Sequence, residues 1–463
     1  MQIINEIRDN NGSICYERIC KNNENNILWK DIICFPSFTR DQKNGCKAII
    51  MYTSDMKPIE TAFSFLNQAT ETYATRRQAV PALKLLFSYE TIIGKKLADF
   101  TIADIEAFKD FLKGISYGGI ELQFNLIETR DNGTTNTYLG IYRKYCDHIG
   151  VSNKILNQRG VTSQNVFNGN FSDKIAPYRH NERVIQESEV PMYISEEDFK
   201  RIITVIRSKY SIREEIIVRL MYEEGLRIGE VLGLTNDDIV EENIVGKGWT
   251  NVLYLRNRCS DKKVSQSAKG CMKVRTVSDY NRKEYKLPGY GFQTVPIKHD
   301  LAELINAYIE EAHLEARAKH GKEYWEQVSA DRVRAPEKFE DPNFYIFLNS
   351  NGGRLLQQTW NKTMRAIFTA AGLSIDTGKR VHNLNHRFRH GFAMIHVKNG
   401  VKPLELQKLL RHTSLDSVTR YYRPTTSDVI DIKERFEKQL HTDIPELSTV
   451  TVTEDISCDT VSR

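Results

Sequence analysis

Apolar residues recur at helical spacing in two stretches between residues 101 and 150. The sequence TIAD at 101–104 has the form of a helix-capping box. The residues after it place one apolar face on a helix: Ile105, Phe108, Phe111 and Leu112. An Asn-Gly turn at 132–133 precedes a second such face, formed by Leu139, Tyr142, Cys146 and Ile149. The pattern predicts a helical domain over residues 56–150.

The segments on either side of this domain lack such a period. Residues 1–55 are polar and rich in Asn, with short β-like runs such as the one at 48–52. Residues 151–193 are rich in Asn, Gln, Ser and Arg, which is typical of a linker. We expect residues 441–463 to form a flexible tail.

A second capping box, SEED at 195–198, begins another patterned region. Helical stretches alternate there with β-like runs at 251–256, 293–297 and 344–348. From residue 386 to residue 440 the pattern is almost entirely helical. We therefore predict a multidomain fold in which a mainly α domain is followed by a mixed α+β domain over 194–440.

The composition is that of an ordinary globular chain. Of its 463 residues, 40% are hydrophobic and 27% are charged, and at about 150 residues per domain the length favours roughly three domains. No run of about 18 apolar residues is present, which excludes a membrane span. The first residues, MQIINEIRDN, lack the basic-then-apolar pattern of a secretory signal, so we expect a cytosolic protein.

Eight cysteines raise the alternatives of zinc binding and disulfides. They lie at positions 15, 20, 34, 46, 146, 259, 271 and 458, and no CxxC pair occurs among them. Zinc sites usually have compact paired spacing, and disulfides are rare without secretion. We therefore interpret most of these cysteines as small buried apolar residues and expect no metal site.

Positive charge is concentrated in one segment. The whole chain nets +5, but residues 256–298 contain eleven Lys or Arg and three Asp or Glu, hence 11 − 3 = +8. Such segregated charge is typical of phosphate binding, although a solvated loop would look the same. The candidates for DNA contacts in this segment are Arg256, Arg258, Lys262 and Lys273.

Two motifs gather arginine and histidine. In GLRIGE, Arg227 and Glu230 are three residues apart and share a helix face, as a phosphate clamp or as a structural ion pair would. In HRFRH, His386 shares a face with Arg389, and His390 lies one turn beyond His386. Histidines at 382, 386 and 390 also have metal-ligand spacing, but the interspersed arginines disfavour a cation. Arginine and histidine without carboxylates suit an anion such as a DNA phosphodiester.

A third motif supplies a nucleophile. In HTSLDSVTRYY, Tyr421 follows His412 by nine residues and is adjacent to Tyr422. A tyrosine hydroxyl among cationic groups can attack phosphorus and form a covalent ester. Two core aromatics on a helix are the alternative for an isolated tyrosine pair, but they would not explain His412 or the two upstream motifs.

The three motifs together resemble the tyrosine recombinase (phage integrase) family. GLRIGE is similar to its first arginine box, HRFRH to its second box and HTSLDSVTRYY to its nucleophile box. The resemblance covers about residues 195–425, and the helical segment at 56–150 resembles the SAM-like core-binding domain. Residues 1–55 would then be a candidate N-terminal arm-type DNA-binding segment.

The resemblance implies type IB strand exchange without a cofactor. Tyr421 would attack the scissile phosphate, forming a 3′-phosphotyrosine and freeing a 5′-hydroxyl. Arg227 and Arg389 would hold the non-bridging oxygens as charge develops in the transition state. His386 would be the general base toward the tyrosine, and His412 would hydrogen-bond the phosphate. No metal or nucleotide is required, because the phosphotyrosine conserves the energy of the broken bond.

The family also uses a lysine on a β-hairpin as general acid, and here its position is less clear. Lys269, followed by Gly270, best resembles the family's lysine turn, and Lys262 is the second choice. Glu230 would brace the pocket by its place in the first box. Arg411 departs from the pattern, because the family usually has glycine before the histidine.

The resemblance implies double-stranded DNA at specific recombination sites as the partner, a homotetramer on DNA, accessory DNA-bending or directionality factors, and a place in the bacterial cytosol or nucleoid. We expect a site-specific recombinase that moves a mobile genetic element. A topoisomerase-like or telomere-resolving enzyme and a catalytically inactive DNA-binding relative are the alternatives. After residue 426, an apolar helical stripe would pack on its own domain or on an adjacent protomer: Val429, Ile432, Phe436 and Leu440.

Overall fold

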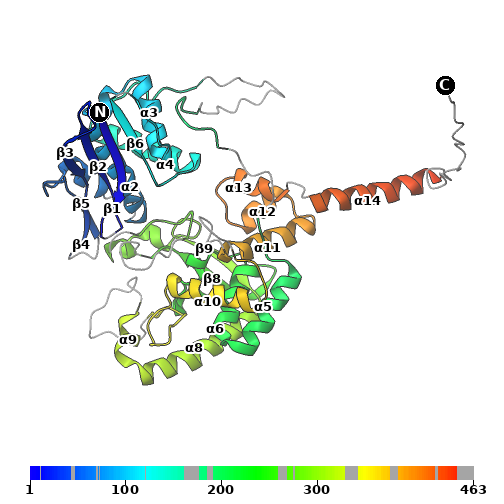
Figure 1. Ribbon diagram of the computed structural model, residues 1–463. Helices are drawn as coiled ribbons and strands as arrows, with labels where there is room; N and C mark the ends of the chain where they lie inside the picture. The colour runs from blue at the N-terminus through cyan, green and yellow to red at the C-terminus, as the bar shows by residue number, and fades with distance from the viewer. Residues whose placement is uncertain are drawn as a thin grey trace, which may run out of the picture. The chain divides into compact units, whose positions relative to one another are not determined.

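The computed structural model shows two compact units (Figure 1). It describes residues 1–445 except 11, 43–46, 69–70, 72, 120, 161–176, 185–190, 259–267, 275–276, 329–342, 376–383 and 423–425. The first unit comprises Met1–Ile185 with Gly229–Trp360, and the second comprises Gln186–Ile228 with Asn361–Arg463. Among the described helices, none is both long and apolar enough to cross a membrane.

A four-stranded sheet lies at the beginning of the first unit. Its order is β3-β2-β1-β6, with β1 antiparallel to β2 and parallel to β6. The bounds of these strands are Gln2–Arg8 (β1), Ile14–Lys21 (β2), Ile27–Ile33 (β3) and Leu122–Asn125 (β6). Strands β4 (Ser37–Asp41) and β5 (Lys47–Met51) form a separate antiparallel pair.

The predicted helices of this region are present. They are α1 (Glu60–Leu66), α2 (Tyr73–Ile93), α3 (Ile102–Lys113) and α4 (Asn132–His148), with the short η1 (Leu97–Asp99). The capping box is formed, because the Thr101 hydroxyl accepts a hydrogen bond from the Asp104 amide at 3.3 Å. Of the apolar face predicted for α3, all four members are buried: Ile105, Phe108, Phe111 and Leu112.

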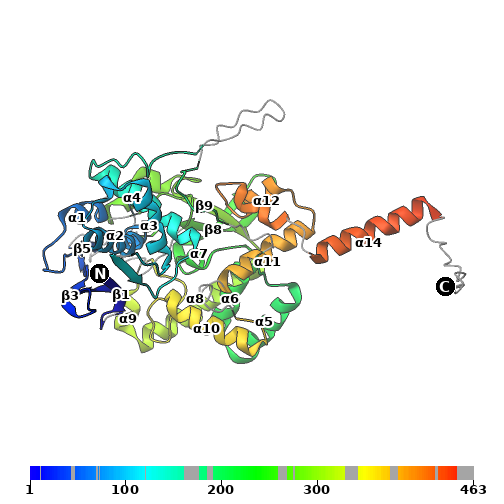
Figure 2. The same cartoon turned by 45° about the horizontal axis from the view of Figure 1, so that its top comes forward.

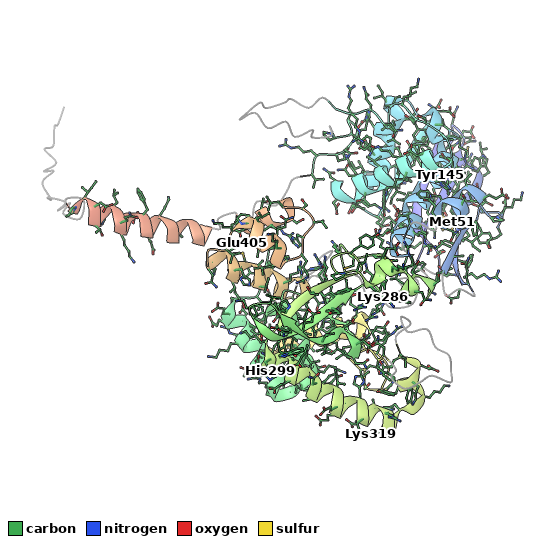
Figure 3. All side chains as sticks on the ribbon, turned by 180° about the vertical axis from the view of Figure 1, so that it is seen from behind. Met51, Tyr145, Lys286, His299, Lys319 and Glu405 are labelled. Atoms are coloured by element: carbon green, nitrogen blue, oxygen red, sulfur yellow. The ribbon has the colours of Figure 1, made fainter. Side chains whose placement is uncertain are left out.

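The structure corrects the expected boundary at residue 55. One hydrophobic core runs from Ile4 to Leu156, and the Tyr16 ring on β2 lies 5.2 Å from the Phe111 ring on α3. Met51 and Tyr145 are likewise members of this core, from opposite sides of the boundary (Figure 3). Residues 1–55 therefore pack with the helices as one domain, because burying the inner face of β1 and β2 requires the helices.

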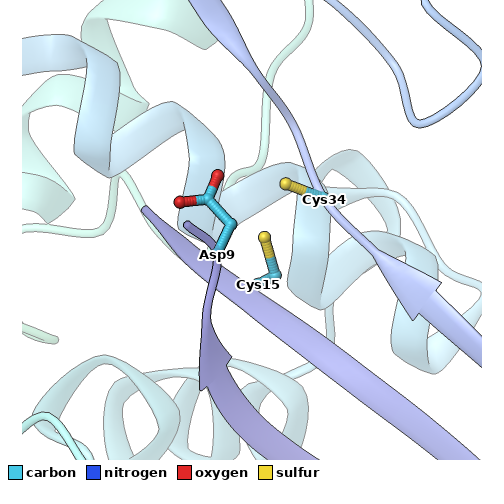
Figure 4. Close-up of side chains that lie close together, drawn as sticks. All are labelled: Asp9, Cys15 and Cys34. Atoms are coloured by element: carbon cyan, nitrogen blue, oxygen red, sulfur yellow. The ribbon is translucent and has the colours of Figure 1, made fainter. Parts of the chain in front are cut away.

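A cluster of two thiols and a carboxylate lies beside this sheet (Figure 4). The ligand-type atoms of Asp9, Cys15 and Cys34 are within 4.8 Å of one another. Asp9 already accepts a hydrogen bond from the Ser13 amide at 2.7 Å. Burial raises the pKa of the Cys15 thiol to about 12, and a hydrogen bond with Cys34 adds to this effect. Both cysteines are free thiols, so we interpret the two thiols as packing groups.

The rest of the first unit contains an antiparallel sheet in the order β7-β8-β9. Its elements are β7 (Ile239–Ile244), β8 (Gly248–Arg256), β9 (Phe292–Ile297), α8 (His299–Lys319) and α9 (Gly321–Glu326), with the short η2 (Asn236–Asp238), η3 (Val277–Asn281) and η4 (Lys283–Lys286). The strands predicted at 251–256 and 293–297 are confirmed. The strand predicted at 344–348 is wrong, because that buried segment makes single bridges, such as Thr235 with Tyr345, instead of a ladder.

The second unit is helical in its described part. It contains α5 (Glu196–Lys209), α6 (Ile212–Tyr222), α11 (Leu384–Lys398), α12 (Pro403–Leu409), α13 (Asp416–Thr419), the short η6 (Arg420–Tyr422) and α14 (Thr426–Asp443). The chain passes between the two units inside two of the helices. One crossing lies within α7 (Ile228–Val231), after Ile228, and the other lies within α10 (Gln357–Ala370), after Trp360. Helix α11 packs against α6, α12 and η6, and Figure 2 shows it beside α6 and α12. This packing places the second and third sequence motifs together.

Candidate active site

Arg389 connects all three motifs from its place on α11. Its guanidinium is buried and donates to the carbonyl oxygens of Gly225 in the first motif and Leu410 in the third. Gly225 has φ +60, and a Cβ there would lie 2.7 Å from the Phe392 ring. Only glycine therefore fits this turn, which places the half-buried Arg227 two residues from the carbonyl that Arg389 holds.

Tyr421 has its hydroxyl in a cationic environment, whereas Tyr422 does not. The Tyr421 side chain is only 2% exposed, and its hydroxyl lies 2.7 Å from Nδ1 of His390. Arg420 donates to the same hydroxyl at 3.2 Å. The Tyr422 hydroxyl instead donates to the Val401 carbonyl at 2.5 Å. The two adjacent tyrosines therefore have different hydrogen-bond partners, and only the Tyr421 hydroxyl contacts described side chains of the motifs.

Basic side chains of the second and third motifs surround His390. Its pKa is lowered to about 3 by burial and then by Arg420, His386, Arg389 and His412. His386 is exposed one turn earlier on α11, with its ring centroid 6.2 Å from that of His390. His412 is fixed after α12 by two hydrogen bonds with Gln407, at 3.0 and 3.1 Å. A concentration of positive charge around a tyrosine hydroxyl can bind a phosphodiester and stabilise negative charge that develops on it.

Comparison with known proteins identifies the family of the region that contains these residues. Residues 192–428 match the phage integrase family model. The chain belongs to the phage integrase family. This family is that of the tyrosine recombinases, which the ordered motifs predicted. The matched region contains all three motifs and ends just after Tyr421.

Relatives of this integrase-family chain include a transposase and tyrosine recombinases. Transposase A from transposon Tn554 of Staphylococcus aureus is 23% identical over 396 residues, which is 83% of this chain and 91% of the transposase. Tyrosine recombinase XerC of Oceanobacillus iheyensis is 23% identical over 241 residues, or 52% of this chain and 58% of the recombinase. The solved Tn1549 transposon integrase in complex with transposon right end DNA is 13% identical, with a TM-score of 0.43, and the match covers 81% of this chain and 97% of that one.

The backbone at Arg411 accounts for the family's usual glycine at this position. Arg411 has φ +51, in the left-handed region that glycine adopts without cost. In this integrase-family chain the guanidinium donates to the Leu409 carbonyl at 3.2 Å and to the Gly225 carbonyl at 3.3 Å. Arg411 therefore adds a second link between the first and third motifs, beside the one that Arg389 makes.

Lys269 lies at the tip of a tight turn in the first unit. The Cys271 amide donates to the Ala268 carbonyl at 3.3 Å, and Gly270 has φ +90, as position i+2 of a type II turn requires. The buried Asn257, next after β8, accepts from the Ala268 amide at 2.7 Å and donates to three carbonyls of the turn. Lys269 itself is exposed on this fixed support. The second choice, Lys262, lies outside the described residues.

The structure corrects one predicted DNA contact and restricts another. Arg258 is 2% exposed and forms an ion pair with the equally buried Asp238, so it holds the domain together and is closed to a DNA phosphate. Arg256 pairs with the same carboxylate at 3.1 Å and has a side chain that is 16% exposed. Lys273 is exposed, in keeping with its predicted role. Glu230, predicted to brace the pocket, is buried in the first unit.

Sequence reasoning missed two residues that organise these sites. The histidine spacing presented His390 only as a candidate metal ligand, although its place in HRFRH, directly after Arg389, was a usable signal. Asn257 gave no signal, because a lone asparagine after a strand is common in loops. Its four hydrogen bonds to the lysine turn become visible only in three dimensions.

Proposed function

We propose that this chain is a site-specific DNA recombinase that cleaves and rejoins strands through a 3′-phosphotyrosine intermediate. The observation that carries the proposal is the position of the Tyr421 hydroxyl between His390 and Arg420, within a group of basic side chains from the second and third motifs. A hydroxyl in this environment is suited to attack a bound anion. A nicked suicide substrate tests the proposal, because loss of the short 5′ strand traps the covalent intermediate.

In the proposed reaction, the Tyr421 oxygen bonds to phosphorus as the bond from phosphorus to the 5′ oxygen breaks. Arg227 and Arg389 stabilise the non-bridging oxygens, with His412 as a further donor and His386 as the base that the family resemblance implies. Lys269 protonates the leaving 5′ oxygen. The Tn554 relative, similar over 83% of this chain, supports a role in moving a mobile element, and the partner is then double-stranded DNA at the element's ends.

The general-acid role of Lys269 has a chemical test. A 5′-bridging phosphorothiolate has a leaving group that needs no proton. It should restore adduct formation to Lys269→Ala and should not restore it to Arg389→Ala, which lacks a charge-stabilising group. Lys273→Ala is the matched control, since Lys273 is also exposed and four residues away. Rescue of Lys262→Ala in place of Lys269→Ala would move the role seven residues upstream.

We further propose that α14 docks on a neighbouring protomer in a tetramer on DNA. Phe436, on the predicted apolar stripe, is 63% exposed in the single chain, and Leu440 is half-buried. The side chains of Val429 and Ile432 lie outside the described part. Burying a side chain such as Phe436 in a partner would contribute about 1.5–3 kcal/mol before ordering costs.

Truncation after Thr426 should therefore leave a folded protein that binds one half-site but assembles no synapse. Gel-shift titration measures the binding, and sedimentation of the two-site complex measures the assembly. Phe436→Ala should weaken synapsis in the full chain, whereas Glu437→Ala, an exposed neighbour, should not. Recombination of two sites by the truncated protein at the full-length rate would show that the helix packs in cis.

A further inference from the structure

We propose that His390 is a further catalytic residue, whose Nδ1 takes the proton from the Tyr421 hydroxyl as that hydroxyl attacks phosphorus. The inference rests on the proposed function and assigns the proton acceptor within it. The distance from His390 Nδ1 to the Tyr421 oxygen is 2.7 Å, which is within the reach required of a general base. His390 thus takes the place that the family resemblance gave to His386.

The hydrogen bonds at the Tyr421 hydroxyl determine the direction of transfer. A tyrosine hydroxyl has one hydrogen to donate, and a guanidinium can only donate. Arg420 therefore donates to the hydroxyl at 3.2 Å, and the tyrosine hydrogen points toward the partner that is able to accept it. That partner is His390, with its lone pair on Nδ1 and its hydrogen on Nε2. Arg420 is placed to stabilise the charge left on the oxygen.

The charges around His390 keep its imidazole neutral and link its basicity to DNA binding. Burial and the cationic groups of Arg420 on η6, His386 and Arg389 on α11, and His412 after α12 lower its pKa to about 3. The imidazole is therefore neutral at physiological pH, which leaves Nδ1 free of a proton. A phosphodiester anion bound among these groups offsets their charge and raises the pKa of His390. Phosphate binding would thus turn a weak base into a stronger one at the moment of attack.

The step is balanced in atoms and charge. The bond between the tyrosine oxygen and phosphorus forms while the bond from phosphorus to the 5′ oxygen breaks, and that oxygen takes the electron pair. The phenolic proton moves to His390 Nδ1, and the leaving oxygen receives a proton from the general acid. On religation the 5′-hydroxyl attacks phosphorus and gives its proton back to the general acid, while His390 returns its proton to the departing tyrosine oxygen.

The test compares two histidines of one helix. Single-turnover adduct formation is measured on a nicked duplex taken from the inverted repeats that flank the gene, for the wild type, His390→Gln and His386→Gln. Removing a general base typically costs ~10²–10⁴ in rate, so we expect His390→Gln to lose at least ~10²-fold at neutral pH. The deficit should shrink as pH rises, because hydroxide then removes the tyrosine proton. In the His390→Ala variant, added imidazole should restore part of the rate.

Three outcomes would overturn the inference, and a fourth would count against the proposed function. A wild-type rate and pH profile for His390→Gln would overturn the inference and leave the recombinase function intact. The inference also fails if His390→Ala binds DNA normally in a gel shift but shows a pH-independent loss that imidazole does not rescue, since that is a structural effect. Transfer of the pH dependence and the rescue to His386 would return the role to that residue. Absence of any adduct with the wild type would count against the proposed function itself.

Discussion

Replacing Tyr421 with phenylalanine should abolish covalent protein–DNA adducts, because the variant lacks the one oxygen that bonds to phosphorus. The change removes a single buried atom and its hydrogen bonds with His390 and Arg420, so the fold should persist. DNA affinity should stay close to that of the wild type, because phosphate contacts from many Lys and Arg side chains dominate binding. Denaturing gels of a nicked-substrate reaction measure the adduct, and gel shifts measure the affinity.

The adjacent tyrosine provides the matched control. Tyr422→Phe removes a hydrogen bond to the Val401 carbonyl, which should lower the free energy of unfolding by roughly 0.5–1.5 kcal/mol. Adduct formation should be nearly unchanged, because that hydroxyl is bound to backbone away from His390. If Tyr422→Phe lost the adduct and Tyr421→Phe kept it, the nine-residue register from His412 would be wrong.

Local patterns made much of the helical structure predictable. The capping box at 101–104 forms as expected, and at 195–198 the Ser195 hydroxyl accepts a hydrogen bond from the Asp198 amide, because a cap involves residues only three apart in the chain. The apolar face beginning at Ile105 is buried for the same reason, since periodicity alone determines which side of a helix is apolar. The order of the three motifs also predicted the family, which the family match confirms.

Long-range pairing was beyond such patterns. Strand β1 pairs in parallel with β6, about 120 residues later, and no local feature of β6 marks a four-residue strand. The expected separation at residue 55 failed for this reason. The run at 344–348 has the composition of a strand, but it forms isolated bridges, such as those of Tyr345 with Thr235 and of Phe344 with Val328, and no ladder with the described strands. Arg258 has the charge of a DNA contact, and only the buried Asp238 beside it reveals the structural role.

Within the candidate site, the sequence motifs named candidate residues but could not predict the contacts among them. His386 and His390 lie on one helix, and spacing alone cannot say which imidazole meets the tyrosine. That choice depends on how η6 packs against α11, which places the Tyr421 hydroxyl at Nδ1 of His390. Similarly, the charge of Arg411 was visible, but its positive φ was not.

The second large effect is expected from replacing Arg227 or Arg389, the two arginines proposed to hold the scissile phosphate. Arg389→Ala and Arg227→Ala should each lower the cleavage rate by several powers of ten, given that loss of one preorganised transition-state donor costs ~10²–10³ in rate. DNA binding should fall much less, because these two arginines are a small share of the phosphate contacts. Single-turnover cleavage at saturating protein separates the chemical step from the affinity.

The two arginines should differ in their effect on the fold, which makes the pair informative. Arg389 is 3% exposed and donates to the carbonyls of Gly225 and Leu410. Arg411 also donates to the Gly225 carbonyl, so Arg389→Ala removes the side-chain donor of the Leu410 carbonyl and should lower the free energy of unfolding by about 1–3 kcal/mol. Arg227 is half-buried, and its loss should affect stability less. Thermal unfolding of both variants, measured beside cleavage, then separates the two effects. If Arg227→Ala remains folded and cleaves DNA at the wild-type rate, then cleavage does not require this charge. The assignment of this active site would in that case be wrong.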